Sequence, residues 1–264
     1  MLGLRSLVGW EFRNLVRFPL LELLVVVVAY LSMLSSAGGG SLGLSAQSSW
    51  SIYPGAIARN IMFSFVSDVQ YLYVPTILSV TVFASIGIAR EVEAGFVKVA
   101  LSYPIKRRDL FLVKFGSCFL TSLAIFGVAL VSAMFLKNWT ATLYILSFPS
   151  TILAVVGLII YQTFYAASVA TAVAIFSRNT AASFIGSIAI LYMPVYMAQF
   201  ARLDIPFIPP GSTELFSFYI KSASVFWRQY NLFTLVEATM VPILIALVLL
   251  FVSFFYFTRR YDLS

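Results

Sequence analysis

Apolar residues gather in six long segments of the chain, and most charged residues lie between those segments. A helix needs about 17–25 predominantly apolar residues to cross the hydrocarbon core of a bilayer. Each segment reaches that length, so the pattern predicts an all-α, polytopic membrane protein with six transmembrane helices. We expect one membrane domain over residues 1–264. The predicted spans cover about residues 18–36, 71–89, 110–136, 149–176, 181–200 and 235–257.

The stretch before the first span, residues 2–17, combines an apolar stripe with a cationic side. Trp10 offers an interfacial anchor, and Pro19 ends the pattern. We expect an amphipathic helix lying on the cytoplasmic surface of the membrane. A secretory signal peptide is the alternative, because SMLSSAGGG resembles a cleavage site. Cleavage there would remove the first span, which favours the interfacial helix.

The connection between the second and third spans has a second amphipathic pattern. Val92, Phe96, Val99, Ala100 and Tyr103 recur with a helical period, which predicts a short helix over about residues 91–103. Proline then stops the helix, and a basic cluster opens the third span. An apolar helix face with a charged rim suits docking into a groove on a cytosolic partner. The alternative is a helix lying on headgroups, with the basic cluster binding anionic lipid.

Composition and charge agree with a membrane protein. Mean hydropathy is +0.97, 61% of residues are hydrophobic and 10% are charged. The net charge of +7 fits the excess of lysine and arginine in inner segments better than nucleic-acid binding. With the N-terminus inside, the inner segments hold most of the lysines and arginines. We therefore expect both termini in the cytoplasm, in a plasma membrane.

The chain carries few groups for catalysis. It has no histidine, no clustered acidic residues at loop ends and no G-x-x-x-x-G-K-[ST] loop, so we expect neither an enzyme nor a metal site. Its single cysteine, Cys118, lies in an apolar run. Asn138 begins a sequon for N-glycosylation, whose use stays open. The outer connections, residues 37–70 and 201–234, are apolar enough for interfacial or re-entrant helices, and the alternative is helices lying on the lipid surface.

Polar residues within spans are candidates for function because they are costly in lipid. Gln162, beside Tyr161 and Tyr165 in the fourth span, is expected to line a translocation path or a dimer seam. Glu237, at the outer end of the sixth span, is a second candidate for the path. Structural use of these side chains is the competing interpretation.

The charged connection after the second span resembles the ABC-type-two permease family, the membrane subunits of exporters with the type V fold. The family motif has an acidic pair, a glycine, a helical turn, a Thr/Ser-x-Pro element, a basic–acidic pair and a lysine. These places are filled by Glu91, Glu93, Gly95, Leu101, Ser102-Tyr103-Pro104, Arg107 or Arg108 with Asp109, and Lys114. The entry helix, Glu11 to Pro19, and the link from Ser177 to Ala182 look similar too. Phe96 and Lys98 stand where the family often has an acidic residue.

The resemblance implies a mechanism and a set of docking residues. Two permease subunits pair, as a homo- or heterodimer, and each coupling helix seats in a groove on a cytoplasmic ABC-type ATPase. That ATPase would bind ATP and magnesium, and this chain would bind no cofactor itself. The alternative is an ion-driven secondary transporter or channel subunit; the substrate stays open. The expected docking residues are Glu91, Glu93, Gly95, Phe96, Val99, Ala100, Leu101, Tyr103, Pro104, Arg107 and Arg108.

Overall fold

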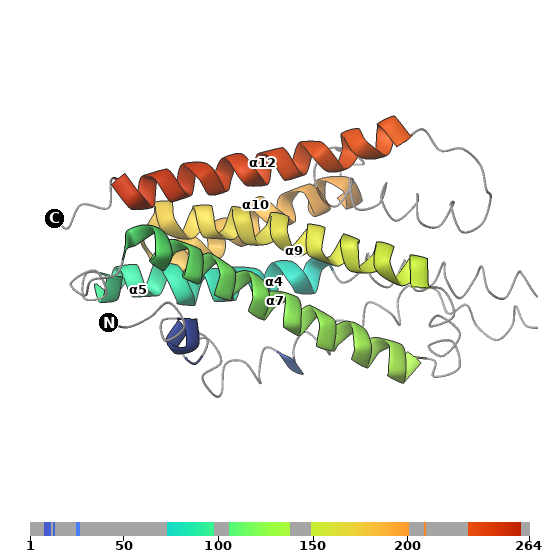
Figure 1. Ribbon diagram of the computed structural model, residues 1–264, viewed down its shortest axis with the longest axis horizontal. Coiled ribbons are helices and arrows are strands. Elements are labelled where there is room, and N and C mark those ends of the chain that lie inside the picture. Colours follow the sequence, from blue (N-terminus) through green and yellow to red (C-terminus); the bar gives the residue numbers. More distant parts are fainter. Residues whose placement is uncertain are drawn as a thin grey trace, which may run out of the picture.

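The computed structural model describes residues 8–11, 13, 25–26, 73–97, 106–137, 149–200, 209 and 232–259. Within these residues the chain is almost wholly helical and forms no strand. The elements lie roughly side by side along one direction (Figure 1). They are α4 (Tyr73–Ala84), the π-helix η2 (Ser85–Ala89), α5 (Arg90–Glu93), α7 (Arg107–Lys137), α9 (Pro149–Ser177), α10 (Thr180–Phe200) and α12 (Leu232–Arg259).

Within the described residues, five helices are long and apolar enough to cross a membrane, which makes the chain a multi-pass membrane protein. These candidate spans are Tyr73–Glu93, Arg107–Val131, Val155–Ser177, Thr180–Met197 and Thr239–Arg259. The second to sixth predicted segments are therefore helical, within a few residues of the expected bounds. The first predicted span, residues 18–36, lies outside the described residues except for Val25 and Val26.

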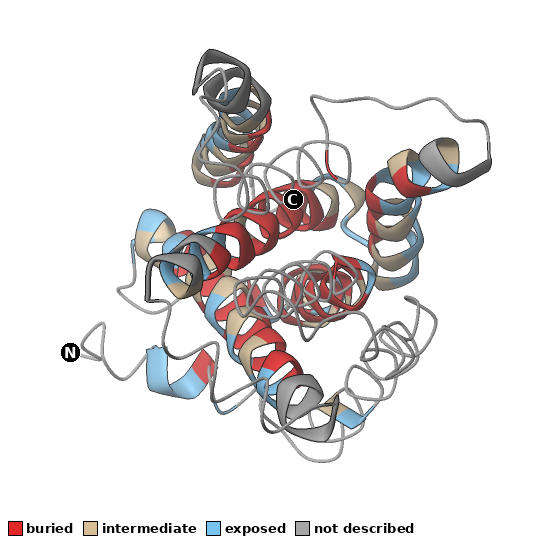
Figure 2. Cartoon of the chain, turned by 90° about the vertical axis from the view of Figure 1, so that its right-hand side faces the viewer, coloured by how far each residue is buried: buried red, intermediate tan, exposed pale blue. Residues whose placement is uncertain are grey.

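Helix α9 is the centre of the bundle. It packs against α4, α7, α10 and α12, and 83% of its spanning window is buried, against 22% for the windows in α10 and α12. Figure 2 shows buried residues concentrated on inner helices, and peripheral helices whose buried faces alternate with exposed ones. An apolar outer face suits helices that lie against lipid, because lipid tails are as apolar as the side chains.

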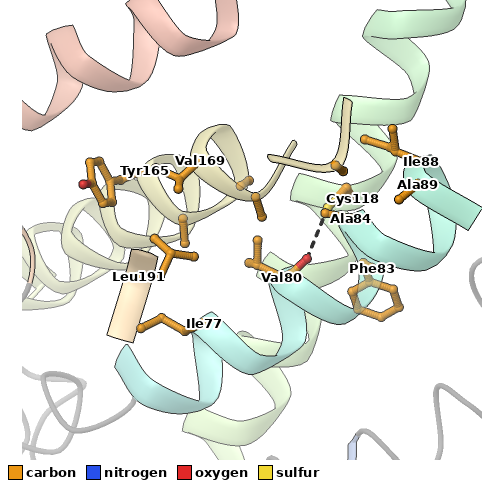
Figure 3. Packing of buried hydrophobic residues seen from close by; sticks show 14 of the residues in the cluster. Ile77, Val80, Phe83, Ala84, Ile88, Ala89, Cys118, Tyr165, Val169 and Leu191 are labelled. Carbon is orange, nitrogen blue, oxygen red and sulfur yellow. Dashed lines mark hydrogen bonds between the residues drawn. The ribbon is translucent and has the colours of Figure 1, made fainter. Parts of the chain in front are cut away.

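The core joins small and large apolar side chains from several helices. Ile77 and Val80 of α4 lie on the side of Leu191 of α10 and Val169 of α9, whereas Ala84 lies beside Cys118 of α7 (Figure 3). The helices approach closely at small residues. A Cβ added to Gly186 of α10 would lie 3.2 Å from a methyl group of Val173 in α9, so a larger residue at this crossing would require Val173 to shift by a few tenths of an ångström. The hydrophobic effect does not drive helices together inside a bilayer, so close packing at small residues stabilises their association instead.

The span made by α4, η2 and α5 is not a regular α-helix. Residues Ser85–Ala89 form a π-helix, in which the amide of Arg90 donates to the carbonyl of Ser85. A π-turn contains one extra residue and leaves carbonyls without their usual partners. The hydroxyl of Ser85 donates to that of Ser183 at 3.2 Å, which ties this irregular turn to α10.

The predicted helix over residues 91–103 is not continuous. Helix α5 ends at Glu93, and Gly95 follows with φ of +76°, a left-handed conformation that glycine adopts without strain. The amide of Gly95 donates to Val92 and closes the turn. Val92 and Phe96 therefore belong to different helical segments, and the prediction that they share one helix face is wrong. Residues 98–105 lie outside the described residues.

Candidate functional site

A buried lysine is the centre of the candidate site. Lys114 lies about two turns inside α7, and its side chain is 3% exposed. Its ammonium group donates to Glu11 Oε1 at 2.6 Å, Glu91 Oε2 at 2.5 Å and the carbonyl oxygen of Gly87 at 3.0 Å. An ammonium group has three protons, so all of its donors have acceptors. We call Glu11, Glu91 and Lys114 the buried triad.

The buried triad joins three parts of the chain. Glu11 comes from the helical segment before the first predicted span, Glu91 from α5 and Lys114 from α7. The Gly87 carbonyl belongs to the π-helix, so the lysine also satisfies an acceptor of that irregular turn. Removing one partner from a buried ion pair is costly, because the remaining charge stays away from water. The triad therefore fixes the position of the N-terminal segment against the ends of two spans.

The two carboxylates outnumber the ammonium group, and this affects Glu11. Burial raises the pKa of Glu11 above 4.5, Lys114 opposes that rise and the nearby Glu91 charge adds to it. The folded protein thus holds a proton on Glu11 to higher pH than the unfolded chain does. By linkage, the contribution of Glu11 to stability falls as the pH rises from 4.5 through the raised pKa.

Replacing Glu11 with glutamine is expected to flatten the pH dependence of stability. The parent should lose the Glu11 contribution as the pH rises from 4.5 through the raised pKa of this carboxyl, and the amide side chain, which does not titrate, should remove that component. Thermal unfolding of both proteins in detergent, from pH 5 to 8, measures the difference. Carboxylates outside the triad act equally in the two proteins, so parallel curves would contradict the assignment to the triad.

Glu93 makes a second link at the same end of the bundle. Its carboxylate accepts from the backbone amide and hydroxyl of Thr180, at 2.9 and 2.6 Å, and from Asn179 Nδ2 at 3.1 Å. Thr180 begins α10, so a carboxylate from α5 satisfies an amide of the first turn and faces the positive end of the helix dipole. Asn179 caps the same helix by accepting from Ala182. The α9–α10 link is thereby fastened to α5.

Two arginines join this end to α12. Arg178 Nη2 donates to the hydroxyl of Tyr256 at 2.8 Å, and its guanidinium carbon lies 5.7 Å from the centre of the Tyr256 ring. Arg107 Nη1 donates to the carbonyl of Thr258 at 3.3 Å. Cations suit the carbonyl end of a helix, as at the last turn of α12. Figure 1 shows α5, the start of α7 and the end of α12 gathered at the left.

The predicted docking residues do not form one exposed surface. Phe96 is 59% exposed, whereas Val97 beside it is buried in the core. Glu91, one of the expected docking residues, is buried in the triad. Glu93 and Arg108 are exposed, and Arg107 is partly buried. Val99, Ala100, Leu101, Tyr103 and Pro104 lie outside the described residues.

The residues expected on a translocation path lie inside the bundle. Gln162, Tyr161 and Tyr165 are all buried in α9, so the chain does not present them on its surface as a dimer seam requires. Gln162 is 0% exposed, and neither atom of its amide has a hydrogen-bond partner among the described residues. The hydroxyl of Tyr73 is also buried, and it too lacks a partner within the part of the chain that the structure describes. Glu237 lies in α12, but its side chain is outside the described residues.

Replacing Gln162 with leucine is expected to stabilise the protein by about 1–3 kcal/mol, because an unpartnered buried amide gives way to an apolar side chain. Thr163→Val, beside it in α9, removes one unpartnered hydroxyl and should have a smaller effect. Unfolding of the purified variants in detergent measures both changes. A loss of stability in Gln162→Leu would mean that buried water satisfies the amide in the folded protein.

The sequence indicates which residues take part in these contacts but not how they pair. The family resemblance includes Glu11, Glu91, Glu93, Lys114 and the 177–182 link, but it predicts no contact between them. A lysine two turns inside an apolar helix is a signal that a carboxylate must lie near it. No feature of the sequence indicated that Glu93 contacts α10. None indicated the π-helix, whose Gly87 carbonyl accepts from Lys114.

Comparison with known proteins identifies no family for this sequence. No model of a known protein family matches it, and no curated protein matches it. Among the described residues, no group of three or more acidic, histidine or cysteine side chains is placed to hold a metal ion. The contacts at the charged end of the bundle are therefore the main structural indication of function.

Proposed function

We propose that the chain is the membrane-spanning permease subunit of an ATP-driven exporter of the ABC-type-two family. A separate ATPase subunit would drive it through the segment around Phe96, and substrate would move outward. One observation carries the proposal. Residues that bear the family resemblance, far apart in sequence, meet at one end of the bundle as the buried triad and the Glu93 link.

These contacts give a path for mechanical coupling. Phe96 follows the Gly95 turn directly, and Val97 anchors the same segment in the core. Movement of that segment displaces α5, which holds α10 through Glu93 and α7 through Glu91. The central helix α9 ends at Ser177, and Asn179 in the link that follows donates a hydrogen bond to Glu93. A force at Phe96 is thus distributed to α4, α7 and α10 at once.

The rest of the assembly follows from the same proposal. The charged end of the bundle faces the cytoplasm of the cell, with both termini on that side, and the first predicted span completes a set of six. ATP and magnesium bind to the ATPase subunit, and a second permease subunit completes the transporter. Gln162, Tyr161 and Tyr165 belong to the interior through which the helices rearrange.

Copurification tests the proposal. Mild extraction of the tagged chain from its native membrane is expected to recover an ABC-type ATPase in a fixed ratio, and the chain alone is expected to hydrolyse no ATP. If the purified chain instead moves a substrate in vesicles with only a proton or sodium gradient, it is an ion-driven transporter. Recovery of no ATPase under several detergents would also count against the exporter.

A further inference from the structure

An apolar groove lies between the N-terminal segment and the outer side of α7. Its volume is about 240 Å³, and its walls are almost entirely apolar. That is smaller than a typical site for a whole drug-sized ligand, so it suits a segment of a longer apolar chain. The residues that line it are Val8, Asp109, Leu112, Val113, Gly116, Ser117 and Leu120.

The groove follows the axis of α7. Leu112, Gly116 and Leu120 are four residues apart and therefore lie along one line of the helix. Leu112 is 57% and Leu120 50% exposed, and Gly116 between them has nothing within 4 Å of where a Cβ would be. The glycine thus leaves a notch in this line of side chains, between Leu112 and Leu120, and Val8 lines the same groove from the N-terminal segment. A segment of a hydrocarbon chain lying in this notch fits the shape.

One end of the groove is basic. Arg108 is four residues before Leu112, on the same line of α7, and its side chain is exposed. Arg108 Nε donates to Asp109 Oδ1 at 3.2 Å, and the Arg108 side chain is still 62% exposed. Lys106 beside them is exposed. Arg107 is directed to Thr258 of α12, so Lys106 and Arg108 are the cations at this end of the groove. They outnumber Asp109, and the excess positive charge suits an anionic headgroup.

The opposite wall is held in place by the buried triad. Val8 lies one helical turn before Glu11, whose carboxylate binds Lys114 of α7. Trp10 on the same segment is 50% exposed, as expected of a side chain at a membrane interface. The groove therefore exists only while the N-terminal segment is attached to α7.

We propose that this groove binds one anionic phospholipid from the leaflet at the charged end of the bundle. One acyl chain lies over Gly116 between Leu112 and Leu120, and the phosphate contacts Arg108 and Lys106. The bound lipid covers the seam between the N-terminal segment and α7, and so stabilises their attachment. This inference does not depend on the ATPase partner.

Native mass spectrometry of the purified chain tests the site, with phosphatidylglycerol and phosphatidylcholine of identical acyl chains as probes. The parent is expected to bind one phosphatidylglycerol more tightly than phosphatidylcholine. Gly116→Leu fills this notch in the groove and should weaken binding of phosphatidylglycerol about tenfold. Gly127→Leu is the matched control, because Gly127 lies on the same helix, outside the groove, and also has nothing within 4 Å. Its binding should equal that of the parent.

The charge is tested separately. Arg108→Gln should lower the preference for phosphatidylglycerol about fivefold, the effect of one basic residue near the surface, while Arg259→Gln, an exposed arginine at the end of α12, should change it little. If Gly116→Leu does not fold, Leu120→Gln makes the same test from the exposed wall. Equal binding in Gly116→Leu and Gly127→Leu overturns the site. Equal binding of the two lipids by the parent overturns the anionic assignment.

Discussion

Replacing Lys114 with methionine is expected to destabilise the protein by about 3–5 kcal/mol, the largest effect of any single change at this site. Methionine has a similar length but no charge, so Glu11 and Glu91 would stay buried with no cation between them. The Gly87 carbonyl would also lose its donor. Unfolding of the purified protein in mixed detergent micelles measures the loss.

Two further variants locate the effect in the triad. Lys106→Met removes an exposed lysine just before the start of the same helix and should be nearly neutral. The triple variant Glu11→Gln, Glu91→Gln, Lys114→Met removes all three charges and should recover most of the stability, because no unpaired charge remains. Equal stability of Lys114→Met and Lys106→Met would mean that the buried contacts contribute nothing.

If the proposed ATPase subunit docks at Phe96, replacing Phe96 with alanine is expected to weaken its binding to the chain by about 2–4 kcal/mol, as truncation of a buried aromatic anchor at an interface does. That corresponds to a tenfold to thousandfold loss of affinity at about 1.4 kcal/mol per decade. The side chain is 59% exposed in the chain alone, so folding should not change. Retention of the ATPase on the tagged variant, titrated against free ATPase, measures the affinity.

The neighbouring residue provides the matched control. Val97→Ala alters a side chain that is 3% exposed and belongs to the core, so it should lower the stability of the chain more than its affinity for the partner. Lys106→Ala, at an exposed charged position, should act mainly through the salt dependence of association. Unchanged retention in Phe96→Ala would mean that this aromatic ring contacts lipid and not a partner.

The helices of this protein could be predicted because their composition decides them. A run of apolar residues in a chain this hydrophobic has to satisfy its backbone groups internally, and a helix does so with local hydrogen bonds alone. The third predicted span, residues 110–136, is α7 (Arg107–Lys137) with three residues added before it and one after it. The same argument gives no partner for Lys114, whose two carboxylates lie 103 and 23 residues away in sequence.

The break after α5 shows where periodicity misleads. Val92 and Phe96 are four residues apart, which is the spacing of one helix face, but Gly95 lies between them and adopts a left-handed conformation. Gly95 belongs to the motif of the family resemblance. Its ability to end a helix in a left-handed conformation is the property that predicts the break after α5. The π-helix gave no sequence signal, because residues 85–89 carry no charge or proline to mark a register.

Gln162 illustrates a different limit. Its position within a span marked it as a candidate, and the structure places it in the most enclosed helix of the bundle. Whether a buried amide has a partner depends on side chains from other helices, and their rotations about α9 are set by packing rather than by local sequence. Sequence identified the residue, and only the assembled bundle shows that its amide is unpartnered.

The π-helix sets the rotational register of α5 at the charged end of the bundle. Successive residues of an α-helix are about 100° apart around the axis, so the extra residue in η2 decides which way everything after Ala89 points. Glu91 and Glu93 face Lys114 and Thr180 only in this setting. Passing the bulge along the helix, or expelling it, would turn both carboxylates away from their partners together. The position of this one π-helix thus determines whether the Glu91–Lys114 and Glu93–Thr180 contacts form together.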